Sequence, residues 1–138
     1  ANRFVAEFIG SPPMNFLLVS LTLPLLLTLG EFRLTLSESW KKSLSYYYRT
    51  HILLGIRPEH LKISVPAPKN WQVVVETVEA LGNDTYLFVK LLDEPETRWQ
   101  VRVPPDQQVA PGETLWLSMR LDKIQLFDPQ TEQSIWRS

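Results

Sequence analysis

Two histidines, His51 and His60, are the side chains of this sequence best suited to acid–base or metal chemistry. The sequence contains no cysteine, which excludes disulfides, thiolate metal sites and cysteine nucleophiles. No carboxylate stands at ligand-like spacing beside either histidine. We therefore expect both to be ordinary surface or half-buried residues and not metal ligands.

Acidic residues gather in one place, at Asp93, Glu94 and Glu96. Their carboxylates could bind a hard cation, but Pro95 interrupts them and no glycine-punctuated ligand loop surrounds them, which favours a solvated acidic turn. The sequence also has no phosphate loop and no GxGxxG, GxSxG or HExxH motif. We predict that this chain catalyses no reaction and holds no metal or cofactor of its own.

Any site must be positioned by a chain of 138 residues, of which 44% are hydrophobic. A chain of this size can bury one core of ordinary size or two small fused ones. Its 14 basic and 15 acidic residues give a net charge of −1. Non-specific binding to nucleic acid or to an anionic membrane needs a positive field, so the charge argues against both.

The most apolar run, residues 16–29, contains eight leucines. A membrane-spanning helix needs about 20 predominantly apolar residues in succession. This run is shorter and is interrupted by a proline and three hydroxyl residues, namely Pro24, Ser20, Thr22 and Thr28. We predict buried strands here and no membrane span.

A short helix is predicted at residues 2–9, because Phe4 and Phe8 are spaced i, i+4 and Gly10 can take a left-handed C-terminal position. The sequence Ser11-Pro12-Pro13 prevents the helix from continuing. A helix this short is marginal alone, so it must dock on something. We expect this docking partner to lie outside the chain.

Most of the remaining chain is predicted to form short strands, because apolar and polar residues alternate between turn signals. We expect one or two helical turns at residues 40–44. The predicted strands are residues 14–22, 32–36, 51–56, 73–81, 85–92, 98–103, 115–119 and a short one at 124–126. Several short strands with little helix indicate a mainly β fold, a small barrel or sandwich.

Three consecutive tyrosines, Tyr46, Tyr47 and Tyr48, could form a stacking platform for bases or sugar rings. Successive side chains of a strand point to opposite faces, so three in a row cannot share one face. We favour a packed segment that enters the strand at residues 51–56.

The sequence Gly55-Ile56-Arg57-Pro58-Glu59-His60-Leu61 is predicted to form a fixed bend between two β-rich lobes. Pro58 forces Arg57 into an extended conformation and prevents a central strand from continuing. Arg57 and Glu59 therefore flank the bend, either as a local ion pair or as charges that hold neighbouring segments together. A proline-punctuated segment at residues 65–70 is the best internal boundary.

The clearest hairpin joins residues 73–81 to residues 85–92 through a two-residue turn, Gly82-Asn83. A regular register would place Val74 opposite Leu91 and Glu76 opposite Val89. That register buries Glu76 unless this end of the hairpin is open to solvent.

Three ordered motifs resemble the C-terminal regulatory domain of ATP-binding subunits of sugar-type ABC importers, the maltose and glycerol-phosphate importer ATPases among them. They are residues 4–17, 54–61 and 78–85, and they include Gly10-Ser11-Pro12-Pro13-Met14-Asn15-Phe16, Gly55-Ile56-Arg57-Pro58-Glu59 and Gly82-Asn83. Residues 126–131 are also similar, although Glu132 stands where relatives often have glycine. Residues 23–48 match in hydrophobic pattern alone.

The resemblance implies an OB-like β-barrel domain, called a TOBE domain, with a short N-terminal helix. Residues 1–13 would be a connector helix from a nucleotide-binding domain that is missing here. Residues 14–138 would be the regulatory domain, with an internal lobe boundary near 65–70. ATP and Mg²⁺ are expected only in the nucleotide-binding domain, so the resemblance implies a non-catalytic domain.

The resemblance also implies partners and a location. The partners are a second copy of the same subunit, the ABC permease subunits, and a regulatory protein or small molecule, with no nucleic acid among them. The location is cytoplasmic, at the inner face of the membrane. The family-motif and interface candidates are Gly10, Ser11, Pro12, Met14, Asn15, Phe16, Gly55, Arg57, Pro58, Glu59, Gly82 and Asn83.

Two other functions remain open from the residues themselves. One is a stand-alone binder of a small solute or oxyanion, with Ser11, Asn15 and Asn83 as donors beside backbone N–H groups. The other is a single-strand nucleic-acid groove in which Trp99, Trp116 and Tyr86 would stack on bases. The near-neutral charge makes the second the weaker.

Overall fold

The computed structural model describes residues 13–136. The helix predicted at residues 2–9, and with it most of the expected connector at 1–13, lies outside the described residues. Gly10, Ser11 and Pro12 also lie outside them.

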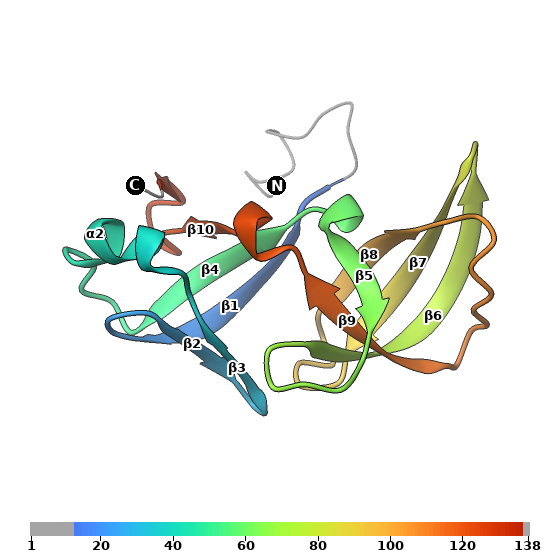
Figure 1. Cartoon of the computed structure of the whole chain (residues 1–138), viewed down its shortest axis with the longest axis horizontal. Coiled ribbons are helices and arrows are strands. Elements are labelled where there is room, and N and C mark those ends of the chain that lie inside the picture. Colours follow the sequence, from blue (N-terminus) through green and yellow to red (C-terminus); the bar gives the residue numbers. More distant parts are fainter. Residues whose placement is uncertain (1–12, 137–138) are drawn as a thin grey trace.

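Within residues 13–136 the chain forms two antiparallel sheets (Figure 1). The first has six strands in the order β11-β10-β4-β1-β2-β3 and the second has five in the order β5-β9-β6-β7-β8. The strands of the first sheet are β1 (Asn15–Thr22), β2 (Leu26–Leu29), β3 (Phe32–Thr35), β4 (His51–Ile56), β10 (Gln125–Phe127) and β11 (Ser134–Ile135). Those of the second are β5 (Leu61–Ser64), β6 (Trp71–Leu81), β7 (Asp84–Leu91), β8 (Arg98–Val103) and β9 (Thr114–Met119).

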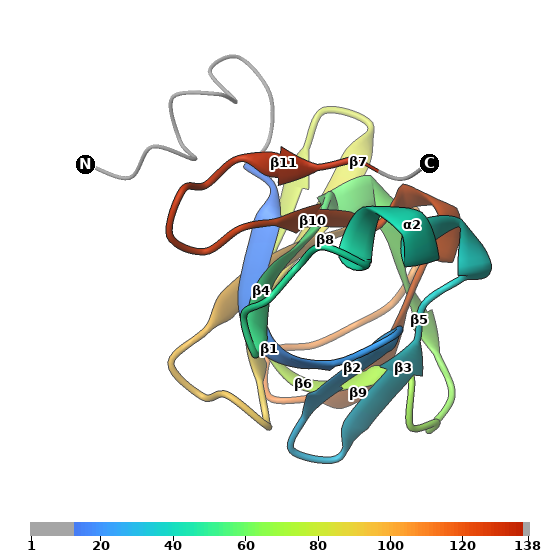
Figure 2. The same ribbon diagram turned by 90° about the vertical axis from the view of Figure 1, so that its left-hand side faces the viewer.

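Four short helical segments join these strands: η1 (Glu38–Trp40), α2 (Lys41–Leu44), η2 (Pro58–His60) and η3 (Leu121–Lys123). The first lobe is the first sheet with η1 and α2, and the second lobe is the second sheet. Viewed end on, the strands of the first lobe curl around a common centre, with α2 beside them (Figure 2). In the second lobe, β5 and β8 approach each other from the two edges of the sheet. The prediction of a mainly β fold built from small OB-like barrels is confirmed.

The apolar run at residues 16–29 forms β1, a turn and β2, as predicted. Along β1 the alternate residues Asn15, Leu17, Val19 and Leu21 are buried, the period expected of a strand with one face toward the core. No helix in residues 13–136 is long and apolar enough to cross a membrane.

The two lobes share one hydrophobic core. Phe32 of β3 stacks on Trp71 of β6, with ring centroids 3.7 Å apart, and Trp71 meets Trp99 of β8 edge to face at 5.6 Å. Both tryptophans are almost fully buried. Aromatic side chains of this size dominate core energetics, so the Phe32–Trp71 contact binds the lobes to each other, while the Trp71–Trp99 contact lies within the second lobe.

The change from one sheet to the other occurs at residues 57–60, where the sequence predicts a bend. The chain returns to the first sheet at residues 120–124, and the two crossings meet through a 2.8 Å bond from the Arg120 N–H to the His60 carbonyl. The segment 65–70 joins two strands of the same sheet and is braced by Asn70, whose amide donates to the Val65 carbonyl at 2.9 Å. Its prolines therefore shape a turn within one lobe.

The β6–β7 hairpin has the predicted register near its tip, where Val78 pairs with Leu87 and Leu81 with Asp84. The predicted pairing of Val74 with Leu91 is wrong, because Val73 pairs with Leu91 and a β-bulge follows Val75.

The bulge also corrects the predicted position of Glu76. Glu76 is the extra residue of the bulge, so it does not face Val89 across the ladder. Its carboxylate instead lies 2.7 Å from the Arg98 guanidinium at the surface.

The tyrosine triplet is packed only at its centre. Tyr47 is buried and its hydroxyl donates to the His51 carbonyl, whereas Tyr46 and Tyr48 are 89% and 78% exposed. The helical turns predicted at residues 40–44 are present as η1 and α2.

Candidate functional site

The Met14-Asn15-Phe16 motif joins the two lobes. The Asn15 side chain pairs with the backbone of Gln100 in β8, donating from Nδ2 to the carbonyl at 2.9 Å and accepting the N–H at Oδ1 at 2.8 Å. The Trp99 indole N–H donates to the Phe16 carbonyl at 3.1 Å. We call these three contacts between β1 and β8 the latch.

Gly55 of β4 pairs with Phe16 of β1 on one side and with Gln125 of β10 on the other. A Cβ at this position would lie 2.6 Å from the Met14 sulfur and 3.0 Å from the Phe127 ring, so no larger residue fits without movement. Phe16 and Phe127 meet edge to face across it, with centroids 5.6 Å apart. Met14, Phe16 and Gly55 are therefore brought together by packing next to the latch.

The bend at residues 57–60 has the predicted form. Arg57 is extended, with φ −78° and ψ 153°, and Pro58 is buried at the start of η2. Glu59 is exposed and Arg57 is half-buried. Burial lowers the pKa of His60, whose Nδ1 is enclosed without a hydrogen-bond partner in the described structure, and the nearby Glu59 opposes this shift.

Gly82 and Asn83 form the exposed tip of the β6–β7 hairpin, where Gly82 has φ 64° as the turn requires. Asn83 thus lies at the end of the second lobe, whereas Asn15 lies at the junction of the lobes with its amide engaged by Gln100. The donors named for an oxyanion site are not brought together among the described residues.

The aromatic rings proposed to stack on nucleic-acid bases are also poorly placed for that role. Trp99 is 1% exposed and Tyr86 is 9% exposed, so neither face is open to a base. Trp116 is half-buried. Among residues 13–136 there is no group of three or more His, Asp or Glu side chains placed to hold a metal ion.

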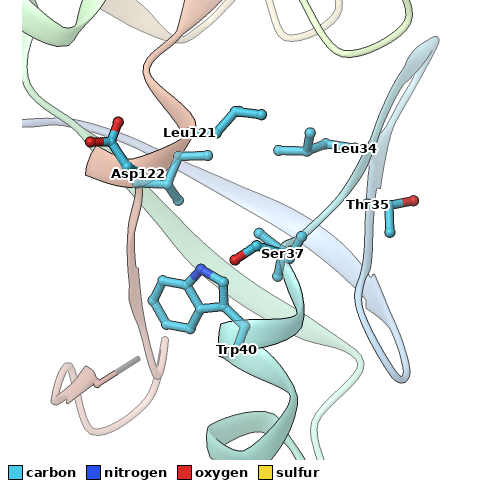
Figure 3. Close-up of a pocket in the computed structure, with 8 residues that line it drawn as sticks. Leu34, Thr35, Ser37, Trp40, Leu121 and Asp122 are labelled. Atoms are coloured by element: carbon cyan, nitrogen blue, oxygen red, sulfur yellow. The ribbon is translucent and has the colours of Figure 1, made fainter. Parts of the chain in front are cut away.

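A pocket of about 270 Å³ lies between β3 and the crossing at residues 120–124 (Figure 3). Leu34 and Leu121 point toward each other across it, and the Trp40 ring lies below them in this view. Ser37 and Asp122 add polar groups to its lining. The pocket is a small, mainly apolar cleft at the junction of the two lobes.

Sequence reasoning did not find this pocket. Ser37 and Trp40 signalled a helix start, but nothing local indicates that residues 120–124 pass beside them. That neighbourhood depends on the return of the chain to the first sheet, a long-range contact.

The family comparisons agree with this architecture. The model of the TOBE domain matches residues 54–127, and the model of the MalK OB fold domain matches residues 10–61. The cytoplasmic molybdate-binding protein ModG has a similar fold, with a TM-score of 0.63 over 83% of this chain and 96% of that one. Its sequence identity is only 12%, so the likeness is one of fold.

Curated relatives are similar along nearly the whole chain. The sn-glycerol-3-phosphate import ATP-binding protein of Salmonella typhimurium is 34% identical over 98% of this chain and 36% of its own length. The multiple sugar-binding transport ATP-binding protein of Streptococcus mutans is 33% identical over 98% of this chain and 37% of its own length. The chain thus spans little more than a third of the relatives it matches. The TOBE model covers more than half of the chain and the two-lobed β structure fits it, so this chain belongs to the TOBE-domain family.

Proposed function

We propose that this chain is the non-catalytic regulatory domain of the ATP-binding subunit of an ABC importer for carbohydrates or related solutes. The observation that carries the proposal is the similarity to import ATP-binding proteins over 98% of the chain. In this proposal, ATP and Mg²⁺ bind a preceding nucleotide-binding domain. The subunit works in the cytoplasm, at the inner face of the membrane, with permease subunits.

The geometry supports a domain that acts through its surfaces. Its lobes are joined by the latch and by the stacked rings of Phe32 and Trp71, and the two crossings between them are tied by the Arg120–His60 bond. A body connected at so many points moves as a unit, so it can hold two subunits at a fixed spacing while their catalytic domains open and close. We propose a second copy of the same subunit as its principal partner.

The exposed bend is the part of the family motif best placed for pairing. Glu59 is exposed and Arg57 half-buried, and both precede β5, while Met14, Asn15 and Phe16 are occupied inside the molecule. Charges at the rim of an interface fix its arrangement and its association rate. Arg57 and Glu59 are therefore the residues we assign to pairing.

The test compares the 138-residue chain with the full-length subunit. We expect no ATP turnover by the chain alone, and pairing of the full-length subunit in sedimentation experiments with nucleotide present. ATP turnover that depends on these 138 residues alone would overturn the proposal, as would a full-length subunit that stays monomeric under all nucleotide conditions. Calorimetric heat with only sulfate or molybdate would support an oxyanion binder instead.

A further inference from the structure

A second hollow, also of about 270 Å³, adjoins the pocket in Figure 3. The two share Trp40, Asp122 and Ile124 in their linings. The lining of the second also includes Gln125 and Trp136. We call it the Trp136 groove, and no part of the family motif or the latch lines it.

The backbone of Trp136 is held in place, whereas its side chain is exposed. Its backbone follows β11, which pairs with β10, and its carbonyl accepts a hydrogen bond from the Ser43 hydroxyl of α2. The residue is nevertheless 80% exposed. A large, exposed aromatic ring beside a hollow is a ready-made contact surface for a ligand.

The turn before β11 makes this placement firm. Asp128 accepts the N–H groups of Gln130 and Thr131 at 2.8 and 3.1 Å, and its other oxygen accepts from Arg49 Nε at 3.1 Å. These bonds fix the path of the chain from β10 to β11. The indole is thereby presented by ordered backbone.

The polar groups of the groove are available to a ligand. Gln125 and Ser134 are half-buried in its wall, and within residues 13–136 their side chains make no hydrogen bond to the protein. An amide and a hydroxyl together offer both donors and acceptors. At the edge, the Asp122 carboxylate is paired with the Arg120 guanidinium at 3.2 Å, and Lys123 adds a further positive charge. All three side chains are exposed, so solvent and salt screen these charges and they give the groove little selectivity for an anion.

We propose that the Trp136 groove binds the ring of a neutral saccharide. The apolar C–H face of the sugar packs on the Trp136 indole, while ring hydroxyls replace water at Gln125 and Ser134. A pocket that combines an apolar surface with a few placed polar groups suits such an amphipathic ligand.

Binding here would contact η3, the segment through which the chain returns between the lobes. A sugar in the groove would therefore serve as the small-molecule signal of the regulatory domain. This regulatory role rests on the proposed function, whereas binding itself does not.

The binding test titrates the 138-residue chain with maltose and with glucose, followed by tryptophan fluorescence and calorimetry. We expect saturable binding to at least one of them, with Kd on the order of 1 mM or tighter. Trp136→Ala should weaken binding about tenfold or more, with Trp136→Phe in between. Tyr46→Ala is the matched control, because Tyr46 is 89% exposed and does not line the groove, and it should leave Kd unchanged.

The proposal is overturned if neither sugar binds saturably, or if Trp136→Ala binds as well as the unchanged chain. Tighter binding of sn-glycerol 3-phosphate than of either sugar, abolished in Trp136→Ala, would also overturn the choice of a neutral ligand. ATP turnover of the full-length subunit is measured with and without the sugar that binds. Sugar binding by the chain without any ATP turnover by the subunit would refute the proposed function and leave the groove standing, whereas turnover without sugar binding would refute the groove alone.

Discussion

At the scale of single residues, the family motif proves to be largely architectural. The Asn15 side-chain amide bonds both the carbonyl and the N–H of Gln100, as the backbone of a neighbouring strand would. Gly55 has no side chain, which leaves room for the side chains of Met14 and Phe127. The sequence alone could mark these residues through the resemblance but could not assign their contacts. Gln100 lies 85 positions away from Asn15, and no local pattern reports such a pairing.

Replacing Asn15 by alanine should loosen the latch. The variant leaves the N–H and C=O of Gln100 without their partners in a partly buried place, which we expect to lower the free energy of unfolding by about 2–4 kcal/mol. Chemical denaturation followed by tryptophan fluorescence measures this change. Asn83→Ala at the exposed hairpin tip is the control and should change stability by less than about 0.5 kcal/mol. Equal effects of the two variants would contradict the latch.

Glu132, where the resemblance to the family leads us to expect glycine, has φ 65°. A residue with a Cβ destabilises the fold by roughly 1–2 kcal/mol when its backbone adopts the left-handed conformation, whereas glycine does not. We expect Glu132→Gly to raise the free energy of unfolding by about 1 kcal/mol. Glu132→Ala keeps the Cβ and should give no such gain. If both variants behave alike, strain at this backbone position is not the cause.

At the scale of elements, the sequence predicted the strands and turns that depend on neighbouring residues alone. Strand β8 and the tip of the β6–β7 hairpin follow from alternation and from the Gly82-Asn83 turn. The bulge at Glu76 did not, because it lies where β6 also bonds to the segment before β9, with Gly112 N–H donating to the Val75 carbonyl at 2.7 Å. The pairing of β10 with β4 is likewise long-range and left no signal in either strand.

Tyr47, in the connection from α2 to β4, should make the stability of the domain depend on pH. Burial, followed by the charge of Asp128, raises the pKa of Tyr47 to about 12, against the opposing effect of Arg49. The unfolded chain ionises this phenol near pH 10. The favourable contribution of neutral Tyr47 is therefore complete below about pH 10 and is lost as the pH rises toward 12.

Tyrosinate absorbance and denaturation measured across this range test the prediction. The folded chain should show one tyrosine that titrates late, and Tyr47→Phe should remove it. The same variant should lose stability less steeply between about pH 10 and 12. A late-titrating tyrosine that persists in Tyr47→Phe would contradict the assignment.

At the scale of the whole molecule, the two lobes form one body with a shared core, and the chain passes between them at residues 57–60 and 120–124. The sequence predicted the first crossing from Pro58. It could not predict the second, since the return of β10 to the first sheet depends on pairing with β4. For this reason the pocket of Figure 3 and the Trp136 groove could be found only in the folded molecule.

Arg57→Ala tests the role assigned to the bend. We expect it to destabilise either the folded domain or the subunit pair by on the order of 1 kcal/mol. The reason is that a charge which positions segments or copies is removed. ATP turnover per paired full-length subunit should stay unchanged, since the bend has no part in nucleotide chemistry. Thermal unfolding and sedimentation measure the two effects. Unchanged stability together with unchanged association would refute the role.

The most direct test of the central claim is the sequence of the gene product on the amino-terminal side of Ala1. An ATP-binding subunit of an ABC importer requires a phosphate loop followed by the ABC signature motif, and we predict that both precede this domain. A gene product that contains neither would contradict the claim that this TOBE domain regulates an importer ATPase.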